Sequence, residues 1–307
     1  MGRFNPFLLR YKKEENQVTE LLLHVLDETG LAGPFLASLL DQPNLATKNF
    51  TMDTQLHRSF PNKVRSRIVL GISANGVLNE SSSDLVNGDP DGYFYSSSSE
   101  YIVLLEVKVG SAELYSDQLD RHANRVPATP FSEHIPCKWE SVVTFFQEQL
   151  GSEPEGAKNA YIIRNFLDFL KKQALGLAPD EESLFYRSGR HEKTVRMIHD
   201  YLTGLKYQPE FYNKLDPWAM EYKKGGKSHA CVDLKLERMV FKFHYTGHKE
   251  KMEDKIRDLF GRNYSGSYSD IRSEACVYLE DIAPSDLDKF KTLLEETISL
   301  RQQRPGQ

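Results

Sequence analysis

Hydrophobic residues recur along the first part of the chain at two different spacings, which predict helices followed by strands. In residues 12–28 they fall three and four positions apart, a pattern typical of an amphipathic helix. The apolar positions of this helix are Val18, Leu21, Leu22, Val25 and Leu26. We expect a second helix over 34–42 and strands over 48–58 and 64–72, the latter rich in β-branched residues. Residues 79–90 are rich in Ser, Asn, Gly and Asp, which predicts a loop.

The most hydrophobic run in the chain is YIVLLEVKV, residues 101–109. Its length and branching are those of a strand, and so continuous a run favours a strand buried on both faces at the centre of a sheet. Only Glu106 and Lys108 interrupt it. Because they are two positions apart, both side chains project from the same face. The run therefore predicts two charged side chains near the end of a buried strand.

The rest of the chain predicts two regions of different organisation. In the first half, further helices are expected over 111–123, 139–150 and 158–175. Residues 124–138 have three prolines and little regular pattern, and the acidic stretch 177–183 is expected to be a linker. In the second half we expect helices over 190–205, 248–260 and near the C-terminus, and strands over 229–236, 238–245 and 273–279. These patterns predict an α/β domain over residues 1–180 and an α+β domain over 181–307.

Composition and charge narrow the class of protein. The chain has 307 residues, with 44 acidic against 39 basic residues and a net charge of -5. Proteins that coat nucleic acid by charge alone usually have a basic excess, whereas an enzyme can meet phosphates locally through metal ions. No stretch approaches the roughly 20 apolar residues of a membrane helix, and no secretion signal is recognisable. Three widely spaced cysteines favour a reducing compartment, so we expect a cytoplasmic protein with no membrane contact.

Candidate chemistry centres on the strand over 101–109. Asp91 follows Pro90 ahead of this strand, and its carboxylate can converge with that of Glu106 on a neighbouring strand. Mg²⁺ and Mn²⁺ prefer oxygen ligands, and Mg²⁺ keeps several waters. Two carboxylates and the main-chain carbonyl of Val107 would leave room for water and a phosphate oxygen. Lys108 could orient or deprotonate that water, or neutralise charge in the transition state.

This arrangement, Asp91 followed by Glu106-Val107-Lys108 on a hydrophobic strand, resembles the signature of the PD-(D/E)XK nuclease superfamily. The likeness extends to the first helix, where Glu15-Asn16-Gln17-Val18-Thr19 is similar to the "EN-x-x-T" helix of several bacterial restriction and defence branches. In those branches the helix glutamate completes the metal site. The resemblance therefore implies that Glu15 joins Asp91 and Glu106 around the metal.

The likeness continues beyond the lysine strand and covers roughly residues 10–175. Gln118 resembles the glutamine that these branches carry on the next helix, and His122 stands where an aromatic residue is common. The resemblance implies that Gln118 positions Lys108 or the substrate backbone, within a restriction-endonuclease-like α/β/α core with a central mixed sheet. Members usually have another core strand after the glutamine helix. Residues 124–136 predict only a poor strand, so we expect a shortened or irregular sheet edge there.

The function implied by the resemblance is that of a Mg²⁺- or Mn²⁺-dependent endonuclease that hydrolyses phosphodiester bonds with activated water. DNA is the favoured substrate over RNA, and anti-phage defence is the expected setting. The acidic net charge suggests that a homo-oligomer or a defence-system partner supplies basic surface. The second half would regulate, dimerise or sense a ligand. The alternative is a catalytically inactive nuclease fold that serves as a binding or regulatory module through its second half.

Each candidate residue also has a plainer interpretation. Glu106 and Lys108 could lie on the solvated face of an edge strand. Asp91 could be a turn residue, Glu15 an ordinary acid favoured by a helix N-terminus, and Gln118 a surface residue.

A basic segment in the second half is a weaker candidate for contact with nucleic acid. Lys223, Lys224 and Lys227 flank two glycines and could touch phosphates. The favoured interpretation of this segment is a solvated hairpin.

Overall fold

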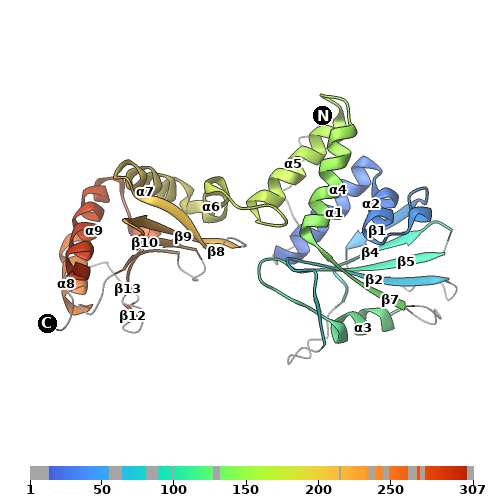
Figure 1. Ribbon diagram of the computed structural model, residues 1–307, viewed down its shortest axis with the longest axis horizontal. Helices are drawn as coiled ribbons and strands as arrows, with labels where there is room; N and C mark the ends of the chain where they lie inside the picture. Colours follow the sequence, from blue (N-terminus) through green and yellow to red (C-terminus); the bar gives the residue numbers. More distant parts are fainter. Residues whose placement is uncertain are drawn as a thin grey trace. The chain divides into compact units, whose positions relative to one another are not determined.

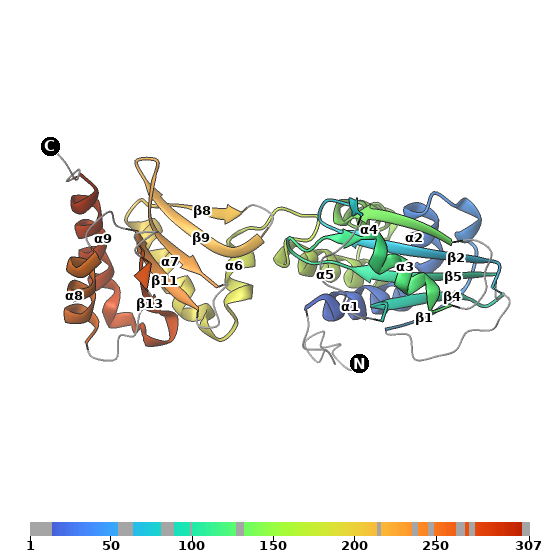
Figure 2. The same ribbon diagram turned by 90° about the horizontal axis from the view of Figure 1, so that it is seen from below.

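The computed structural model describes residues 14–54, 64–80, 89–98, 100–126, 132–213, 216–234, 239–244, 249–261, 268–269 and 274–302. The chain divides into two compact units (Figures 1 and 2). Unit 1 comprises residues 1–171 with 175–178, and unit 2 comprises 172–174 with 179–307. The sequence-based boundary at residue 180 falls beside this junction. No helix within the described ranges is both long and apolar enough to cross a membrane.

Unit 1 is built on a mixed sheet. Among its described residues, five strands lie in the order β1-β4-β5-β2-β7. Their bounds are β1 Phe50–Thr54, β2 Ser66–Ser73, β4 Gly92–Ser96, β5 Tyr101–Val107 and β7 Ser132–Lys138. The pairs β1/β4 and β4/β5 are antiparallel, and β5/β2 and β2/β7 are parallel. A small parallel pair, β3 (Leu78–Asn79) with β6 (Leu114–Tyr115), forms a second sheet of two strands.

Helices cover both faces of the sheet, so unit 1 has α/β/α layers (Figure 1). The helices are α1 Glu14–Thr29, α2 Ala32–Leu39, α3 Ser116–Asn124, α4 Trp139–Ser152 and α5 Lys158–Lys172. Alternate residues of β5 enter different cores, since successive strand side chains point to opposite faces. Val103 and Leu105 pack with α1, α2, α4 and α5, whereas Ile102 and Leu104 pack with α3. Burial on both faces explains why the sequence of β5 is almost continuously apolar.

Unit 2 has a different architecture. Its described strands form an antiparallel sheet in the order β12-β13-β11-β10-β9-β8. The strands are β8 Gln208–Asn213, β9 Asp216–Lys224, β10 Lys227–Asp233, β11 Val240–His244, β12 Tyr268–Ser269 and β13 Glu274–Tyr278. The helices are α6 Glu181–Ser188, α7 Glu192–Gly204, α8 Lys249–Phe260 and α9 Leu287–Gln302. All four contribute to a single core against one face of the sheet.

Several sequence-based expectations differ from this architecture. The segment after α3, expected to give a poor strand, forms β7, which pairs with β2 along its whole length. Its parallel partner supplies hydrogen bonds that outweigh a weak local propensity, and at the sheet edge Pro136 costs little. The acidic stretch expected as a linker contains the start of α6, capped by Asp180. Strands β8 and β9 were not expected. The expected loop over 79–90 lies mostly outside the described residues.

The packing of α2 gives a test of unit 1. A Cβ on Gly33 would lie 2.8 Å from the carbonyl oxygens of Leu45, Ala46 and Lys48. Backbone cannot move aside cheaply, so Gly33→Ala should destabilise the protein by about 1–3 kcal/mol. Gly151→Ala is the matched control, because nothing lies within 4 Å of the added methyl group; alanine in a helix should stabilise by about 0.5–1 kcal/mol. Thermal unfolding measures both, and equal melting temperatures for Gly33→Ala and the wild type would contradict the tight packing.

Candidate functional site

Strand β5 carries the candidate residues to one end of the sheet. Glu106 pairs in register with Gly71 of β2, and Val107 pairs with Ile72. The Lys108 N–H donates to the Ile72 carbonyl at 2.7 Å, which continues the parallel pairing by one residue. Since β5 lies between β4 and β2, the edge-strand interpretation of Glu106 and Lys108 is wrong.

Asp91 meets this end of β5 because antiparallel pairing brings the start of β4 to the end of β5. Its Oδ2 accepts a hydrogen bond from the Val107 N–H at 2.8 Å. In an extended strand the N–H and C=O of one residue point to the same side, so we expect the Val107 carbonyl on the Asp91 side as well. Asp91 is therefore more than a turn residue, because its carboxylate bonds the backbone of β5.

The Glu106 carboxylate is the most enclosed charge of the group, and its residue is 3% exposed. Its Oε1 accepts hydrogen bonds from Lys108 Nζ at 2.7 Å and Gln118 Nε2 at 2.6 Å. His122 Nε2 lies 2.8 Å from Oε2. Burial alone would raise the pKa of Glu106, but the hydrogen bond from His122 and the charge of Lys108 outweigh burial and hold the pKa below its usual value. Glu106 is thus held as a carboxylate.

The Lys108 side chain is 13% exposed and ion-paired to Glu106. Burial lowers the pKa of Lys108, but the charge of Glu106, with those of Glu15 and Asp91, raises it above its usual value overall. The backbone is fixed as well, because the buried Trp139 indole donates to the Lys108 carbonyl at 2.8 Å. Lys108 is therefore a positioned cation in the metal-free protein.

Glu15 approaches this group from α1, on its first turn. Its charge raises the pKa values of both Asp91 and Lys108, which indicates that Glu15 lies near both. Gly92 permits this close approach. A Cβ there would lie 2.9 Å from Leu23 and 3.3 Å from the methyl group of Thr19, one turn beyond Glu15. Because glycine has no Cβ, α1 can pack directly against the start of β4.

The donor set suits a hard divalent ion that keeps much of its water. Within the described ranges no group of three or more His, Cys, Asp and Glu side chains is arranged to hold a metal. Mg²⁺ is usually bound by only one or two carboxylates with several waters, and Asp91 and Glu106 can supply these. Burial, and next the charge of Glu106, raise the pKa of Asp91 to about 8. A cation between these carboxylates would relieve that repulsion.

The sequence did not assign roles to two residues that the structure brings to the site. His122 lies four residues after Gln118 on α3, so both face Glu106 from the same side of the helix. That spacing was a usable signal. Trp139 lies far from Lys108 in the sequence and follows β7, so its contact depends on the register of the sheet. Nothing in the local sequence indicates it.

The basic segment of unit 2 is the β9–β10 hairpin, which turns at Gly225 and Gly226 with positive φ. Lys223 Nζ pairs with Glu210 at 2.7 Å. Lys224 Nζ lies 5.0 Å from the centre of the Tyr207 ring. The hairpin interpretation agrees with this geometry, and a nucleic-acid contact through Lys227 and its neighbours stays a prediction.

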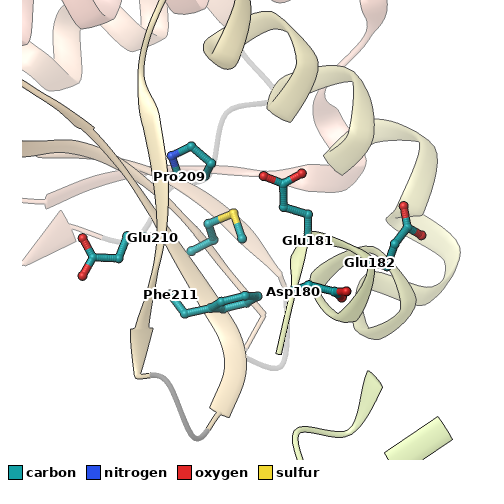
Figure 3. Close-up of a pocket in the computed structure, with 7 residues that line it drawn as sticks. Asp180, Glu181, Glu182, Pro209, Glu210 and Phe211 are labelled. Atoms are coloured by element: carbon teal, nitrogen blue, oxygen red, sulfur yellow. The ribbon is translucent and has the colours of Figure 1, made fainter. Parts of the chain in front are cut away.

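Unit 2 also has an open cavity of about 390 Å³ between the start of α6 and β8 (Figure 3). Its lining includes Asp180, Glu181, Glu182, Glu210 and, at its apolar part, Pro209, Phe211 and Met220. Figure 3 shows Glu182 and Glu210 pointing away from its centre. Each carboxylate is engaged elsewhere: Asp180 caps α6, Glu181 lies 3.3 Å from His199, Glu182 pairs with Arg196 and Glu210 with Lys223. The cavity therefore presents no unengaged charge for a ligand.

Comparison with protein-family models, with curated proteins and with solved structures finds no match to this chain.

The crowding around Asp91 generates a pH-dependent prediction. A raised folded-state pKa means that the folded protein holds a proton that the unfolded chain has released, between the ordinary value of 3.8 and about 8. Stability should therefore fall as pH rises through this range, by at most about 1.4 kcal/mol per pH unit. In EDTA, Asp91→Asn should melt at a higher temperature than the wild type at pH 8, with the difference shrinking toward pH 4.

Two comparisons complete this test. Asp53→Asn, at an exposed position on β1, controls for the loss of a negative charge. Mg²⁺ should raise the melting temperature of the wild type at pH 8 and leave Asp91→Asn unchanged. If Asp91→Asn were less stable than the wild type at pH 8 in EDTA, Asp91 would not be a crowded carboxylate.

Proposed function

We propose that this protein is a metal-dependent nuclease that hydrolyses phosphodiester bonds, with DNA favoured over RNA. The observation that carries the proposal is the meeting of Asp91, Glu106 and Lys108 where β4 begins and β5 ends. This supports the resemblance to the PD-(D/E)XK nucleases, which was inferred from this motif together with the Glu15 helix and Gln118. The mixed sheet with helices on both faces is compatible with such a core.

In this proposal Asp91 and Glu106 would hold Mg²⁺ or Mn²⁺ together with the Val107 carbonyl, and Glu15 would assist from α1. The ion would polarise the phosphoryl group and lower the pKa of its bound water. The protein's part is to keep the Glu106 carboxylate ionised and to fix the positions of both ligands, whereas Asp91, with its raised pKa, would lose its proton when the ion binds. The Val107 N–H orients Asp91, and three side chains orient Glu106. Preorganised ligands of this kind need little rearrangement when charge develops.

Lys108 would stabilise negative charge on the phosphoryl group and orient the attacking water. A lysine whose pKa is raised holds its proton, so in the metal-free state Lys108 is a cation rather than a base. Gln118 would position Lys108 indirectly, because both side chains donate to the same Glu106 oxygen. When Lys108 turns toward substrate, Gln118 keeps a donor on that oxygen.

The acidic balance of the chain limits how substrate is held. With a net charge of -5, binding to DNA would rest on the metal and on local basic groups rather than on a general positive field. A second copy or a partner in an anti-phage defence system would supply the missing basic surface. Unit 2, with its separate core, would serve regulation, dimerisation or ligand sensing.

Cleavage of DNA in the presence of Mg²⁺ or Mn²⁺ tests the proposal. The purified protein should cut plasmid or single-stranded DNA, and EDTA should stop it. Glu106→Gln and Lys108→Ala should each reduce cleavage by at least about 100-fold, since each removes a group that fixes charge at the reacting phosphate. Glu100→Gln and Lys48→Ala should leave the rate near that of the wild type. This ion pair, at 2.7 Å, lies at the start of β5, at the opposite end of the strand from the candidate site.

The same assay distinguishes the nuclease proposal from the alternative, a catalytically inactive binding or regulatory module. A well-folded protein that cuts no DNA or RNA with either ion, alone or with candidate partners, would overturn the nuclease proposal. The inactive binding module would then be the better description.

A further inference from the structure

Among the described residues, the side chain of the histidine on α3 has a hydrogen-bond contact with the proposed metal ligand alone. His122 is 1% exposed, and its Nε2 lies 2.8 Å from Glu106 Oε2. Its other ring nitrogen, Nδ1, is buried and has no hydrogen-bond partner among the described residues. A buried polar atom without a partner destabilises a fold. A phenylalanine would fill a similar volume without that cost, so packing does not explain a histidine here.

The contact fixes which nitrogen carries the proton. An ionised carboxylate can only accept hydrogen bonds, so Nε2 must donate to Oε2 of Glu106. In the neutral ring Nδ1 is then an acceptor, so a lone pair rather than an N–H group is left without a partner among the described residues. The ring is therefore oriented as a single donor aimed at Glu106.

The three donors to Glu106 divide its two oxygens unequally. Lys108 and Gln118 share Oε1, and within the described residues His122 is the one donor to Oε2 for which a contact is measured. Lys108 is also the donor that the proposed reaction moves toward substrate. Without His122, Oε2 would lose its donor, and Gln118 on Oε1 alone would oppose rotation of the carboxylate whenever Lys108 leaves. With it, the plane of the carboxylate stays fixed while lone pairs remain for a metal.

We propose that His122 is a positioning residue that locks the Glu106 carboxylate in its metal-binding orientation and so sets the affinity of the site for divalent ions. This inference rests on the proposed function, because it assumes that Glu106 is a metal ligand. Removing a group that hydrogen-bonds to a metal ligand, without touching the metal, typically lowers metal affinity or activity by about 10–100-fold. His122 touches neither the metal nor the substrate in this arrangement.

Mn²⁺ binding to the intact protein tests the inference without reference to cleavage. His122→Phe should weaken Mn²⁺ binding, measured by calorimetry or by electron paramagnetic resonance, by about 10–100-fold. Cleavage at saturating Mn²⁺ should stay within a few-fold of the wild type. His122→Gln retains an N–H donor at a similar reach, so it should restore most of the Mn²⁺ affinity. His199→Phe is the matched control, because it removes a buried histidine from the core of unit 2.

The outcomes are distinguishable. If the wild type neither binds Mn²⁺ nor cuts nucleic acid, the proposed function fails and this inference with it. If the wild type binds Mn²⁺ and His122→Phe binds it equally well, the inference alone is overturned. Should the phenylalanine variant fail to fold, the wild type decides, with its ¹⁵N histidine spectrum assigned by comparison with His122→Gln. A proton on Nε2 supports the proposal, and an Nε2 without a proton contradicts it, because only a protonated Nε2 can donate to the carboxylate.

Discussion

A carboxylate held almost out of water needs hydrogen-bond donors wherever protein encloses it. Glu106 is this group in unit 1, and its requirement draws together donors from two elements of the fold. Lys108 comes from the exit of β5, and Gln118 and His122 come from α3. The parallel pairing of β5 with β2 fixes the strand that carries it. The helices and strands at this end of the sheet therefore also position the charged and polar side chains around Glu106.

Much of the framework of unit 1 was accessible from sequence because its strongest patterns are local. The apolar period of α1 and the almost continuous apolar run of β5 reflect burial directly. Strand β7 was missed because its stability lies in pairing with β2, which no local pattern encodes. Strands β8 and β9 were missed for the same reason, since their ladder neighbours define them more than their own propensities do.

The candidate site shows the same division between local and long-range information. Strand geometry places side chains two positions apart on the same face, so the sequence alone predicted that Glu106 and Lys108 lie together. The bond from Val107 to Asp91 depends on where β4 begins relative to β5, which only the assembled sheet determines. The hydrogen bond from Trp139 to the Lys108 carbonyl joins residues on different elements in the same way. Unit 2 has no assigned role, because charged side chains that could contact a ligand form ion pairs with one another instead.

The turn between β4 and β5 has a consequence for how this chain can vary in length. Ser96 Oγ accepts hydrogen bonds from the Glu100 and Tyr101 N–H groups, which sets the residue at which β5 starts. Because side chains alternate along a strand, a shift of β5 by one residue against its neighbours would turn Glu106 to the opposite face, away from α3. The hydrogen bonds of Ser96, at the far end of the strand from the carboxylates, oppose such a shift, so any change in the length of the turn has to leave the start of β5 in place.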